Sequence, residues 1–281
     1  RQEIGFFPTW TARYLLSMDN RMREIMLNQA DITGGCPSHY REFDPTKSFY
    51  KKFINIDDRP KVFTTPTYAN NSGFDMLGAA IGTQTTNWSI DTAHQASMHF
   101  IPYAITGEYY YLQEMQYWAA WNLSASNWNT DWGRNLSMGY IKGQIRGWAW
   151  ALRNVAHAAL MSPNGSPEKS YLENKVQNNI NHLAEKAAIH PLGNISPQDG
   201  SCEGLDSRCT QGTSGWMEDF MLIVLNEMDR FGYDTESVVS QFSNFVINRF
   251  THPEFNPYLG TAYRFPTKLN DGSIPNSWAL V

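Results

Sequence analysis

The sequence predicts an all-α protein built from antiparallel helical hairpins. Apolar residues recur at steps of three and four over seven segments, which is the period of an amphipathic helix. Short turns join these segments into pairs of similar length, and little of the chain alternates with the two-residue period of a strand. The seven segments expected to be helical are 11–29, 89–106, 108–124, 141–161, 168–188, 214–230 and 236–250.

The first three segments are bounded or interrupted by glycine and proline. Apolar side chains such as Leu15, Met22 and Ile25 share one face of the first segment, and the glycines at 34–35 end it. A single glycine separates segments 89–106 and 108–124, so we expect a tight antiparallel hairpin there. Pro102 is expected to kink the earlier helix or end it early.

The fourth segment, 141–161, carries small residues on one side. Gly139, Gly143, Gly147 and Ala151 follow one another at four-residue steps. Each glycine within a helix costs about 1 kcal/mol relative to alanine, so the repetition predicts close approach of a neighbouring helix or a ligand.

The remaining segments have plainer signals. Segment 168–188 is polar and is expected to lie on the surface, while Thr235 is expected to cap the last helix. Residues 251–281 contain four prolines and are expected to be mostly irregular, with room for one short hairpin. Residues 31–88 are also expected to be irregular apart from a short strand at Val62–Thr65. A stretch of this length is usually functional or decorates one face of a scaffold.

Charge and apolarity exclude several function classes. The 281 residues include 22 Lys and Arg against 27 Asp and Glu, a formal net charge of −5, and no basic patch stands out. This argues against a nucleic acid or an anionic membrane as partner. The longest strongly apolar run, Phe220–Leu225, is too short to be inserted in a membrane. No phosphate-binding, dinucleotide, serine-nucleophile or zinc motif occurs, so the sequence predicts neither a cofactor nor a metal.

The cysteines and the first residue give expectations about the compartment of the protein and the extent of its full sequence. Cys202 and Cys209 lie in a polar loop and either form a disulfide or remain two thiols. A disulfide would indicate an oxidising compartment, hence a secreted or periplasmic protein. Because the chain starts with Arg1, we expect 1–281 to be a single domain within a larger protein.

One group of polar residues opens the second predicted helix, directly after Trp88. Asp91, His94 and Gln95 would share one face at i, i+3 and i+4, with Tyr103 further along. Asp91 could tune His94 as a base, while Trp88 and Gln95 would bind substrate. Alternatively, Asp91 complements the positive end of the helix and His94 is a half-buried structural histidine.

A second group opens the fourth predicted helix. The planar guanidinium of Arg146 could clamp a carboxylate such as that of a uronic acid, beside Gln144 and Trp148 as substrate-binding residues. Alternatively, Arg146 pairs with an internal acid and Trp148 belongs to the core.

Carboxylates and aromatic rings also occur together twice. Glu218 and Asp219 follow Trp216 and could act as general acid and base, or could simply favour the start of a helix. The loop with Trp128, Asp131 and Trp132 offers the flat rings and short polar groups that sugars need. Its alternative is a packed, hydrogen-bonded loop. These three residues and Trp216 are predicted to bind substrate.

Two stretches resemble a known superfamily. Asp-Thr-Ala-His-Gln at 91–95 followed by Ile-Pro-Tyr-Ala-Ile-Thr-Gly-Glu-Tyr-Tyr-Tyr-Leu at 101–112, and Gln-Ile-Arg-Gly-Trp-Ala-Trp-Ala-Leu-Arg at 144–153, resemble the inner-then-outer helix pairs of six-hairpin glycosidase-like proteins. The resemblance covers about residues 86–250. It implies an (α/α) toroid-like arrangement with long loops. A closed toroid has about twelve helices, so seven indicate an incomplete ring or part of one.

The resemblance also implies a function. Members include glycoside hydrolases and polysaccharide lyases, so the chain is expected to be a carbohydrate-active domain whose partner is a polysaccharide. In a hydrolase, one carboxylate among Asp91, Glu218 and Asp219 would protonate the leaving oxygen and another would activate water. In a lyase, His94 or Tyr103 would take the proton while Arg146 neutralises the uronate. The alternatives are a non-catalytic glycan-binding or scaffold domain of a larger protein, and an intracellular helical protein without a sugar role.

Overall fold

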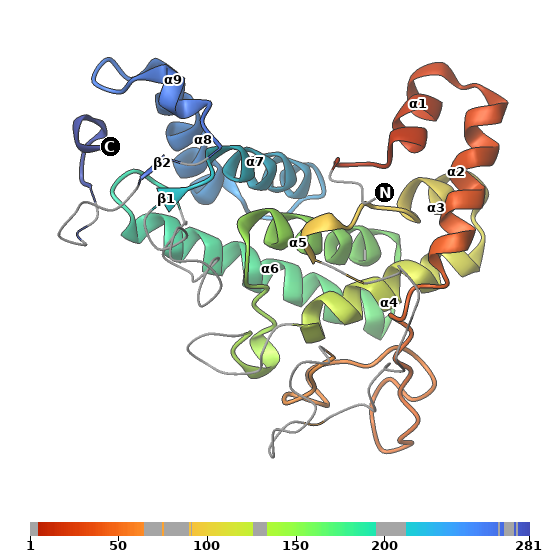
Figure 1. Ribbon diagram of the computed structural model, residues 1–281. Helices are drawn as coiled ribbons and strands as arrows, with labels where there is room; N and C mark the ends of the chain where they lie inside the picture. The colour runs from red at the N-terminus through yellow and green to blue at the C-terminus, as the bar shows by residue number, and fades with distance from the viewer. Residues whose placement is uncertain are drawn as a thin grey trace, which may run out of the picture. The chain divides into compact units, whose positions relative to one another are not determined.

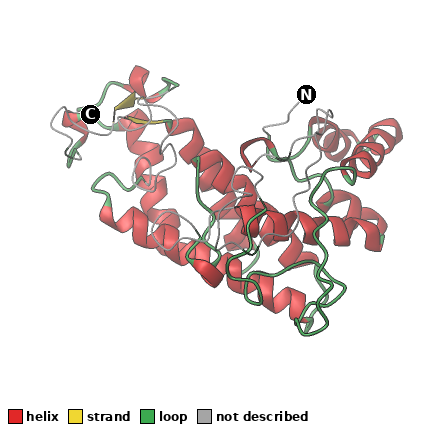
Figure 2. Ribbon diagram, turned by 60° about the horizontal axis from the view of Figure 1, so that its bottom comes forward, coloured by secondary structure: helices red, strands yellow, loops and turns green. Residues whose placement is uncertain are grey.

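The computed structural model confirms the all-α class (Figures 1 and 2). It describes residues 5–64, 75, 90, 92–125, 134–194, 212–263, 265–266, 273 and 275–281. The described α-helices are α1 (Thr9–Ser17), α2 (Asn20–Thr33), α3 (Phe100–Thr106), α4 (Tyr109–Ala125), α5 (Ile145–Met161), α6 (Pro167–Ile189), α7 (Gly215–Arg230), α8 (Glu236–Thr251) and α9 (Pro257–Gly260). Two short strands, β1 (Gly212–Thr213) and β2 (Phe265–Pro266), pair antiparallel.

The chain divides into two compact units. The first unit consists of residues 1–141 and 150–176, and the second unit consists of residues 142–149 and 177–281. Helices α5 and α6 each contribute residues to both units. The toroid-like arrangement of hairpins stays a prediction.

The first predicted helix is two helices in the structure. Met18 adopts the left-handed conformation at φ 54° and ends α1. Asp19 then caps α2, because its carboxylate accepts a hydrogen bond of 2.8 Å from the backbone N–H of Arg21. The prediction of one continuous helix over 11–29 is therefore wrong, since hydrophobic periodicity does not register a change in φ at one residue.

The segment before α3 is also not a continuous helix. Thr92–His94 form a single 3₁₀ turn, and α3 begins only at Phe100. Pro102 is the third residue of α3, where its missing N–H costs no helical hydrogen bond. His94 and Gln95 consequently do not share a face of an α-helix, contrary to the prediction. Helices α3 and α4 pack against each other, and Gly107 between them has φ 69°.

The glycine stripe predicted for the fourth helix does not form. Helix α5 starts at Ile145, so Gly139 (φ 76°) and Gly143 (φ 122°) precede it in conformations that favour glycine. Every residue from 145 to 159 is buried, so α5 is a core helix on all sides. Gly139 instead packs against a side chain of the loop, because a Cβ there would lie 2.9 Å from Ile56 Cδ1.

Helix α6 is more buried than its polar composition suggests. Leu172, Val176, Ile180 and Leu183 form a stripe that is almost fully buried, so the expectation of a surface helix is wrong. Lys169 near its start donates to the carbonyl oxygen of Ala159 at 3.1 Å. Helices α5 and α6 therefore turn back on each other at this end in the predicted hairpin.

The second unit is built on the α7–α8 pair. Gly232 at φ 90° follows α7, and apolar residues such as Val224 and Phe242 are fully buried. Thr235 occupies the capping position of α8, but its hydroxyl contacts Asp229 at 3.4 Å and no side-chain cap forms. The capping prediction is wrong, because Thr235 has φ −118° and ψ −1° in place of the extended backbone that turns a capping side chain toward the helix N–H groups.

The C-terminal residues are less irregular than expected. They contain α9, β2 and a short 3₁₀ turn at Trp278–Leu280. Strand β2 pairs with β1 rather than with a strand inside 251–281. A small core of Leu192, Phe245, Phe255 and Trp278 holds these residues against α8.

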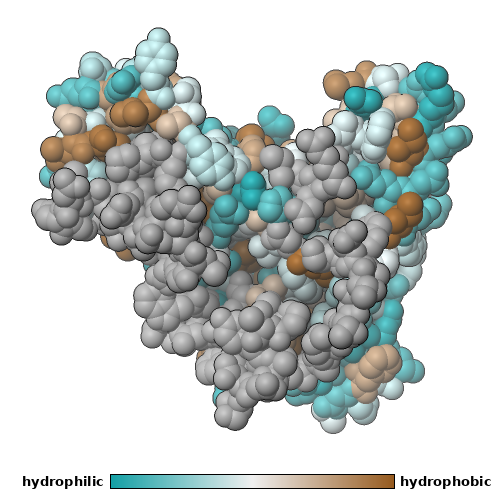
Figure 3. All heavy atoms as spheres, in the orientation of Figure 1, coloured by the Kyte–Doolittle hydropathy of each residue, from teal (hydrophilic) through white to brown (hydrophobic). Residues whose placement is uncertain are grey.

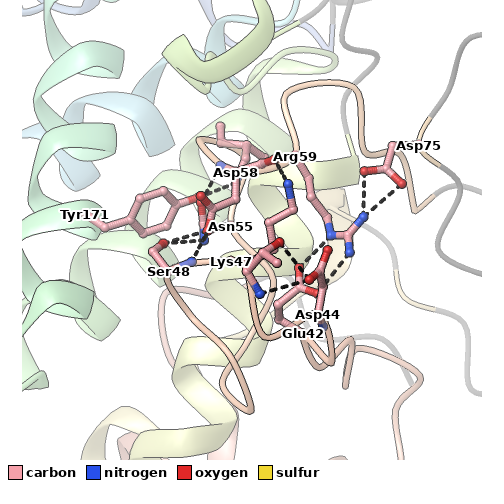
Figure 4. Close-up of polar contacts among 11 residues, drawn as sticks. Glu42, Asp44, Lys47, Ser48, Asn55, Asp58, Arg59, Asp75 and Tyr171 are labelled. Carbon is pink, nitrogen blue, oxygen red and sulfur yellow. Dashed lines mark hydrogen bonds and ion pairs between the residues drawn. The ribbon is translucent and has the colours of Figure 1, made fainter.

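Polar contacts hold the loop 42–59 in a fixed shape (Figure 4). Asp58 accepts hydrogen bonds from the backbone N–H and the hydroxyl of Ser48, at 2.7 and 2.6 Å, and from Asn55 at 2.8 Å. Arg59 bridges Glu42 and Asp75. Val62 forms an isolated bridge with Asp75, and no strand forms over 62–64, while Thr65 lies outside the described residues.

The N-terminal segment packs on α5 through Arg153. Its Nη1 donates to the carbonyl oxygens of Phe6 at 2.7 Å and Gly5 at 3.4 Å, and its Nη2 donates to that of Gln95 at 2.7 Å. The guanidinium also lies 4.5 Å from the centre of the Trp150 ring. A fully buried charge is thus surrounded by backbone oxygens and aromatic faces.

The visible surface mixes hydrophilic and hydrophobic side chains (Figure 3). Leu16 and Met18 are exposed near the corner between α1 and α2. Among the described helices, none is both long enough and apolar enough to cross a membrane.

Candidate functional site

The start of α5 and the start of α7 meet in the second unit. The guanidinium carbon of Arg146 lies 5.3 Å from the centre of the Trp216 ring, which is a cation–π contact. We call this the Arg146–Trp216 site and include Gln144, Asp219 and Arg249 in it. It brings together residues that the sequence predicted in separate groups.

Local backbone geometry places Arg146 in the first turn of α5. Gly143 at φ 122° turns the chain into the helix, and the carbonyl oxygen of Gln144 accepts the first helical hydrogen bond from Trp148 at 2.9 Å. Arg146 is mostly buried, and its Nη2 donates to Gln144 Oε1 at 3.3 Å. The charge of Arg146 is therefore held beside an amide and an aromatic face.

Trp216 is held from the other side. Its indole Nε1 donates to the carbonyl oxygen of Tyr263 at 3.2 Å, and its ring lies 5.5 Å from the Tyr263 ring and edge-on to Phe220 at 5.6 Å. Trp216 remains half-buried, while Tyr263 is 67% exposed. The site thus presents aromatic surface at its rim.

The two neighbouring carboxylates have different surroundings. Both oxygens of Asp219 accept from Nη2 of Arg249, at 2.8 and 2.7 Å, and the Asp219 side chain is 34% exposed. Glu218 is fully buried in the first turn of α7, where the helix dipole favours a negative charge. Glu218 is therefore better explained as an acid that favours the start of α7 than as a catalytic group. Asp219 is the carboxylate that a ligand can reach.

Arg249 was not among the residues predicted from the sequence. It is 1% exposed, and its Nε and Nη1 have no hydrogen-bond partner among the described residues. A Cβ at Gly215 would lie 2.5 Å from Nη1 of Arg249, so any larger residue at the start of α7 would displace the Arg249 side chain. An arginine in the last turn of a helix is common for dipole reasons alone, so the sequence held no distinguishing signal. Tyr263 was missed because nothing near it in the sequence is periodic.

Trp148 belongs to the core. It is fully buried, and its ring lies 5.8 Å from that of His182. Burial, together with Lys142 and Lys186, lowers the pKa of His182 to about 4. The core alternative therefore applies to Trp148 in place of a substrate-binding role.

The remaining described residues of the prediction lie in the first unit. Gln95 is buried, and its amide exchanges two hydrogen bonds with Asn122, at 2.9 and 3.0 Å, and accepts a third from Asn154 at 2.7 Å. It is therefore committed to the interior and does not present its amide to a ligand. His94 and Tyr103 are half-buried, which leaves part of each side chain accessible.

Several predicted residues lie outside the described part of the chain. They are Trp88, Asp91, Trp128, Asp131 and Trp132, together with the cysteines Cys202 and Cys209. Their roles stay predictions. Cys36 is a buried free thiol.

A buried serine–histidine pair in the first unit has the residue types of a nucleophile and its base. Ser97 Oγ lies 2.8 Å from His157 Nδ1, and the His157 ring stacks on Phe100 at 3.8 Å. Both residues are almost fully buried, and the adjoining space of about 10 Å³ holds no more than a water molecule. The pair is therefore a packing feature. Within the described ranges, no cluster of His, Cys, Asp and Glu is arranged to hold a metal ion.

Comparisons with known proteins add no family. No protein-family model, no curated protein and no solved structure matches the chain. The resemblance to six-hairpin glycosidase-like proteins therefore stays a prediction.

Proposed function

We propose that this protein is a carbohydrate-active domain and that the Arg146–Trp216 site holds a uronic acid unit of an acidic polysaccharide. The single observation that carries the proposal is the guanidinium of Arg146 stacked on the half-buried Trp216 ring at the start of two helices. A cation, two helix N-termini and an aromatic face together suit a ligand that carries a carboxylate on a sugar ring.

Each part of the ligand has a matching group. The carboxylate would be neutralised by Arg146 and favoured by the positive ends of the two helix dipoles. The C–H face of the sugar would pack on Trp216 or Tyr263. Gln144 would donate hydrogen bonds to the hydroxyls or accept them, and the Asp219 carboxylate would accept them.

The reaction that follows binding separates two classes of enzyme. In a lyase, a base would remove the proton next to the uronate carboxylate. In a hydrolase, two carboxyl groups would flank the glycosidic bond. Because Glu218 is fully buried and Asp219 is held by Arg249, the Arg146–Trp216 site supports binding and charge neutralisation more directly than it supports a pair of proton-transferring carboxyls.

The same observation favours one alternative function. A non-catalytic glycan-binding or scaffold domain needs the Arg146–Trp216 site without any acid or base. The engagement of Asp219 by Arg249 is compatible with that role. Product analysis distinguishes the two.

The test combines binding and turnover on the full chain. Trigalacturonate and polygalacturonate are offered to the wild type, to Arg146→Lys and to Arg230→Gln. Arg146→Lys keeps the charge but loses the planar fork, so we expect binding to weaken by about tenfold. Arg230→Gln is the matched control, because Arg230 lies at the exposed far end of α7.

The products identify the class. A 4,5-unsaturated product that absorbs in the ultraviolet indicates a lyase, new reducing ends without that absorbance indicate a hydrolase, and binding without product indicates a glycan-binding domain. Unchanged uronate binding by a folded Arg146→Lys variant, or no binding by the wild type, contradicts the proposed site.

A further inference from the structure

The first unit contains a second pocket that no predicted site residue lines. Its volume is about 320 Å³, within the range of small-molecule sites. We call it the loop–α4 pocket. The lining residues used below are Arg41, Lys51, Lys52, Gln113, Gln116 and Tyr117.

Three segments form its walls. The loop 41–53 supplies the basic residues, and α4 supplies Gln113, Gln116 and Tyr117 from positions three and four apart, which lie on one face of a helix. The turn into α6 supplies Ser166 and Glu168. Helices α4 and α6 thus each support one wall of the loop–α4 pocket.

The basic wall is fixed by backbone hydrogen bonds. Arg41 pairs with Phe53 in an antiparallel bridge, and the backbone N–H of Lys51 donates to the carbonyl oxygen of Glu42 at 2.7 Å. Lys51 has φ 64°, a left-handed conformation that costs energy for a residue with a long side chain. The loop holds a lysine in a position where glycine or asparagine would be more stable.

The pocket carries an excess of positive charge. Arg41, Lys51 and Lys52 are opposed by one lining carboxylate, Glu168, which forms an ion pair with Lys52. Arg41 donates to the carbonyl oxygen of Lys51 at 2.6 Å, and its guanidinium lies 5.3 Å from the centre of the Tyr117 ring. These contacts hold the Arg41 charge next to the pocket.

The ring of Tyr117 forms part of the pocket wall beside Arg41. Tyr117 is 2% exposed, and its hydroxyl oxygen is buried without a hydrogen-bond partner among the described residues. A ligand in the pocket would therefore meet the Arg41 guanidinium and the ring of Tyr117 rather than the hydroxyl group.

We propose that the loop–α4 pocket binds a sugar-sized ligand that carries an oxyanion, either the carboxylate or the sulfate ester of an acidic glycan. Lys51 and Arg41 supply the opposing charge, and Gln113 and Gln116 bind hydroxyls. The choice of glycans as probes rests on the proposed function. The pocket itself uses no residue of the Arg146–Trp216 site.

The experiment maps binding by amide chemical shifts in the full chain. Trigalacturonate and a sulfated galactose disaccharide are the charged probes, and cellotriose is the neutral one. We expect shifts of the amides of residues 41–53 and of α4 with one or both charged probes and none with cellotriose. Shifts confined to the start of α5 and α7 would support the Arg146–Trp216 site alone and overturn the loop–α4 proposal.

Two variants separate binding from folding. Lys51→Asn removes a charge and relieves the left-handed strain, so we expect an unchanged or higher melting temperature and affinity about fivefold lower. Tyr117→Phe keeps the ring and removes a buried hydroxyl with no described partner, so stability and affinity should both be kept. Their matched controls are Lys61→Asn, an exposed lysine outside the pocket, and Tyr111→Phe, which removes a hydroxyl that bonds Asp31 at 2.9 Å.

The controls separate affinity from stability. Lys61→Asn should leave affinity unchanged, and Tyr111→Phe should lower stability without changing affinity. The proposal is overturned if neither charged probe binds with a dissociation constant below about 1 mM, or if Lys51→Asn binds as the wild type does.

Discussion

Single residues in the first unit show how polar side chains are used to build the core. Gln95, Asn122 and Asn154 come from three separate segments and satisfy one another inside the protein. Buried amides without partners would cost stability, so their hydrogen bonds specify how these segments pack. A sequence lists such residues as polar but does not show which of them face inward.

Replacing Asn122 tests this network. Asn122→Leu removes both hydrogen bonds to Gln95 and leaves that buried amide without its main partner, so we expect the free energy of unfolding to fall by roughly 2–4 kcal/mol. Urea denaturation measures the change. Asn226→Leu is the matched control, because Asn226 is exposed on α7 and should change stability by less than about 1 kcal/mol. Equal effects of the two variants would contradict a structural network at Gln95.

At the scale of elements, glycines in left-handed conformations decide where helices begin and end. Gly107 ends α3, Gly232 follows α7, and Gly143 precedes α5. Gly139 combines a positive φ with crowded surroundings, whereas Gly232 has a positive φ in open space. Comparing Gly139 with Gly232 therefore separates the energetic cost of a positive φ from the cost of crowding around a Cβ.

Substituting alanine at both positions measures them. We expect Gly232→Ala to lower the free energy of unfolding by about 1 kcal/mol, the cost of a left-handed conformation for a residue with a Cβ. Gly139→Ala should cost about 1–3 kcal/mol more, because its Cβ would lie 2.9 Å from Ile56 Cδ1 and 3.2 Å from Lys175 Cδ. Thermal and urea unfolding measure both losses of stability. Equal losses for the two variants would mean that the Ile56 side chain moves aside to accommodate the new Cβ.

The elements differ in how far the sequence predicts them. Segments 108–124, 168–188, 214–230 and 236–250 match α4, α6, α7 and α8 to within a residue or two, because hydrophobic periodicity is local. The break at Met18 and the late start of α5 depend on φ at single residues, which periodicity does not contain. Asp19 has a side chain that favours a helix N-cap, but the apolar face continues on both sides of it and predicts a single helix.

The candidate site was predictable in part. The residue types of Arg146, Trp216 and Asp219 were identified from chemistry and local spacing. Their meeting, and the pairing of Asp219 with Arg249, depend on contacts between residues distant in the sequence. Burial of Gln95, Trp148 and Glu218 has the same cause, because the packing of other helices decides it.

At the scale of the whole molecule, buried histidines link stability to pH. Burial lowers the pKa values of His99, His182 and His190 to about 4, below the value of about 6.5 for an exposed histidine. Between these two values the unfolded chain binds protons that the folded chain does not. The free energy of unfolding therefore falls as the pH falls from about 6.5 to about 4.

Urea titrations at about pH 6.5 and about pH 5 test this expectation. We expect clearly lower stability at the lower pH, and a smaller difference in the variant His99→Gln. His39, whose pKa is raised by Glu114, does not oppose this trend, because its stabilising effect is fully present below pH 6.5 or so. Glu42, whose pKa is lowered by Arg59, loses its stabilising contribution only under more acidic conditions. A flat profile over this interval would show that the three histidines titrate normally.

The attachment of the N-terminal segment through Arg153 has a practical consequence for anyone who produces shortened versions of this chain. A clone that starts at α1 would delete the carbonyl groups of Gly5 and Phe6 that receive the Arg153 guanidinium. It would leave an interior cation without two of its acceptors, and insoluble product is the expected result. Expression boundaries and affinity tags are best placed upstream of these residues, even though residues 5–8 form no helix.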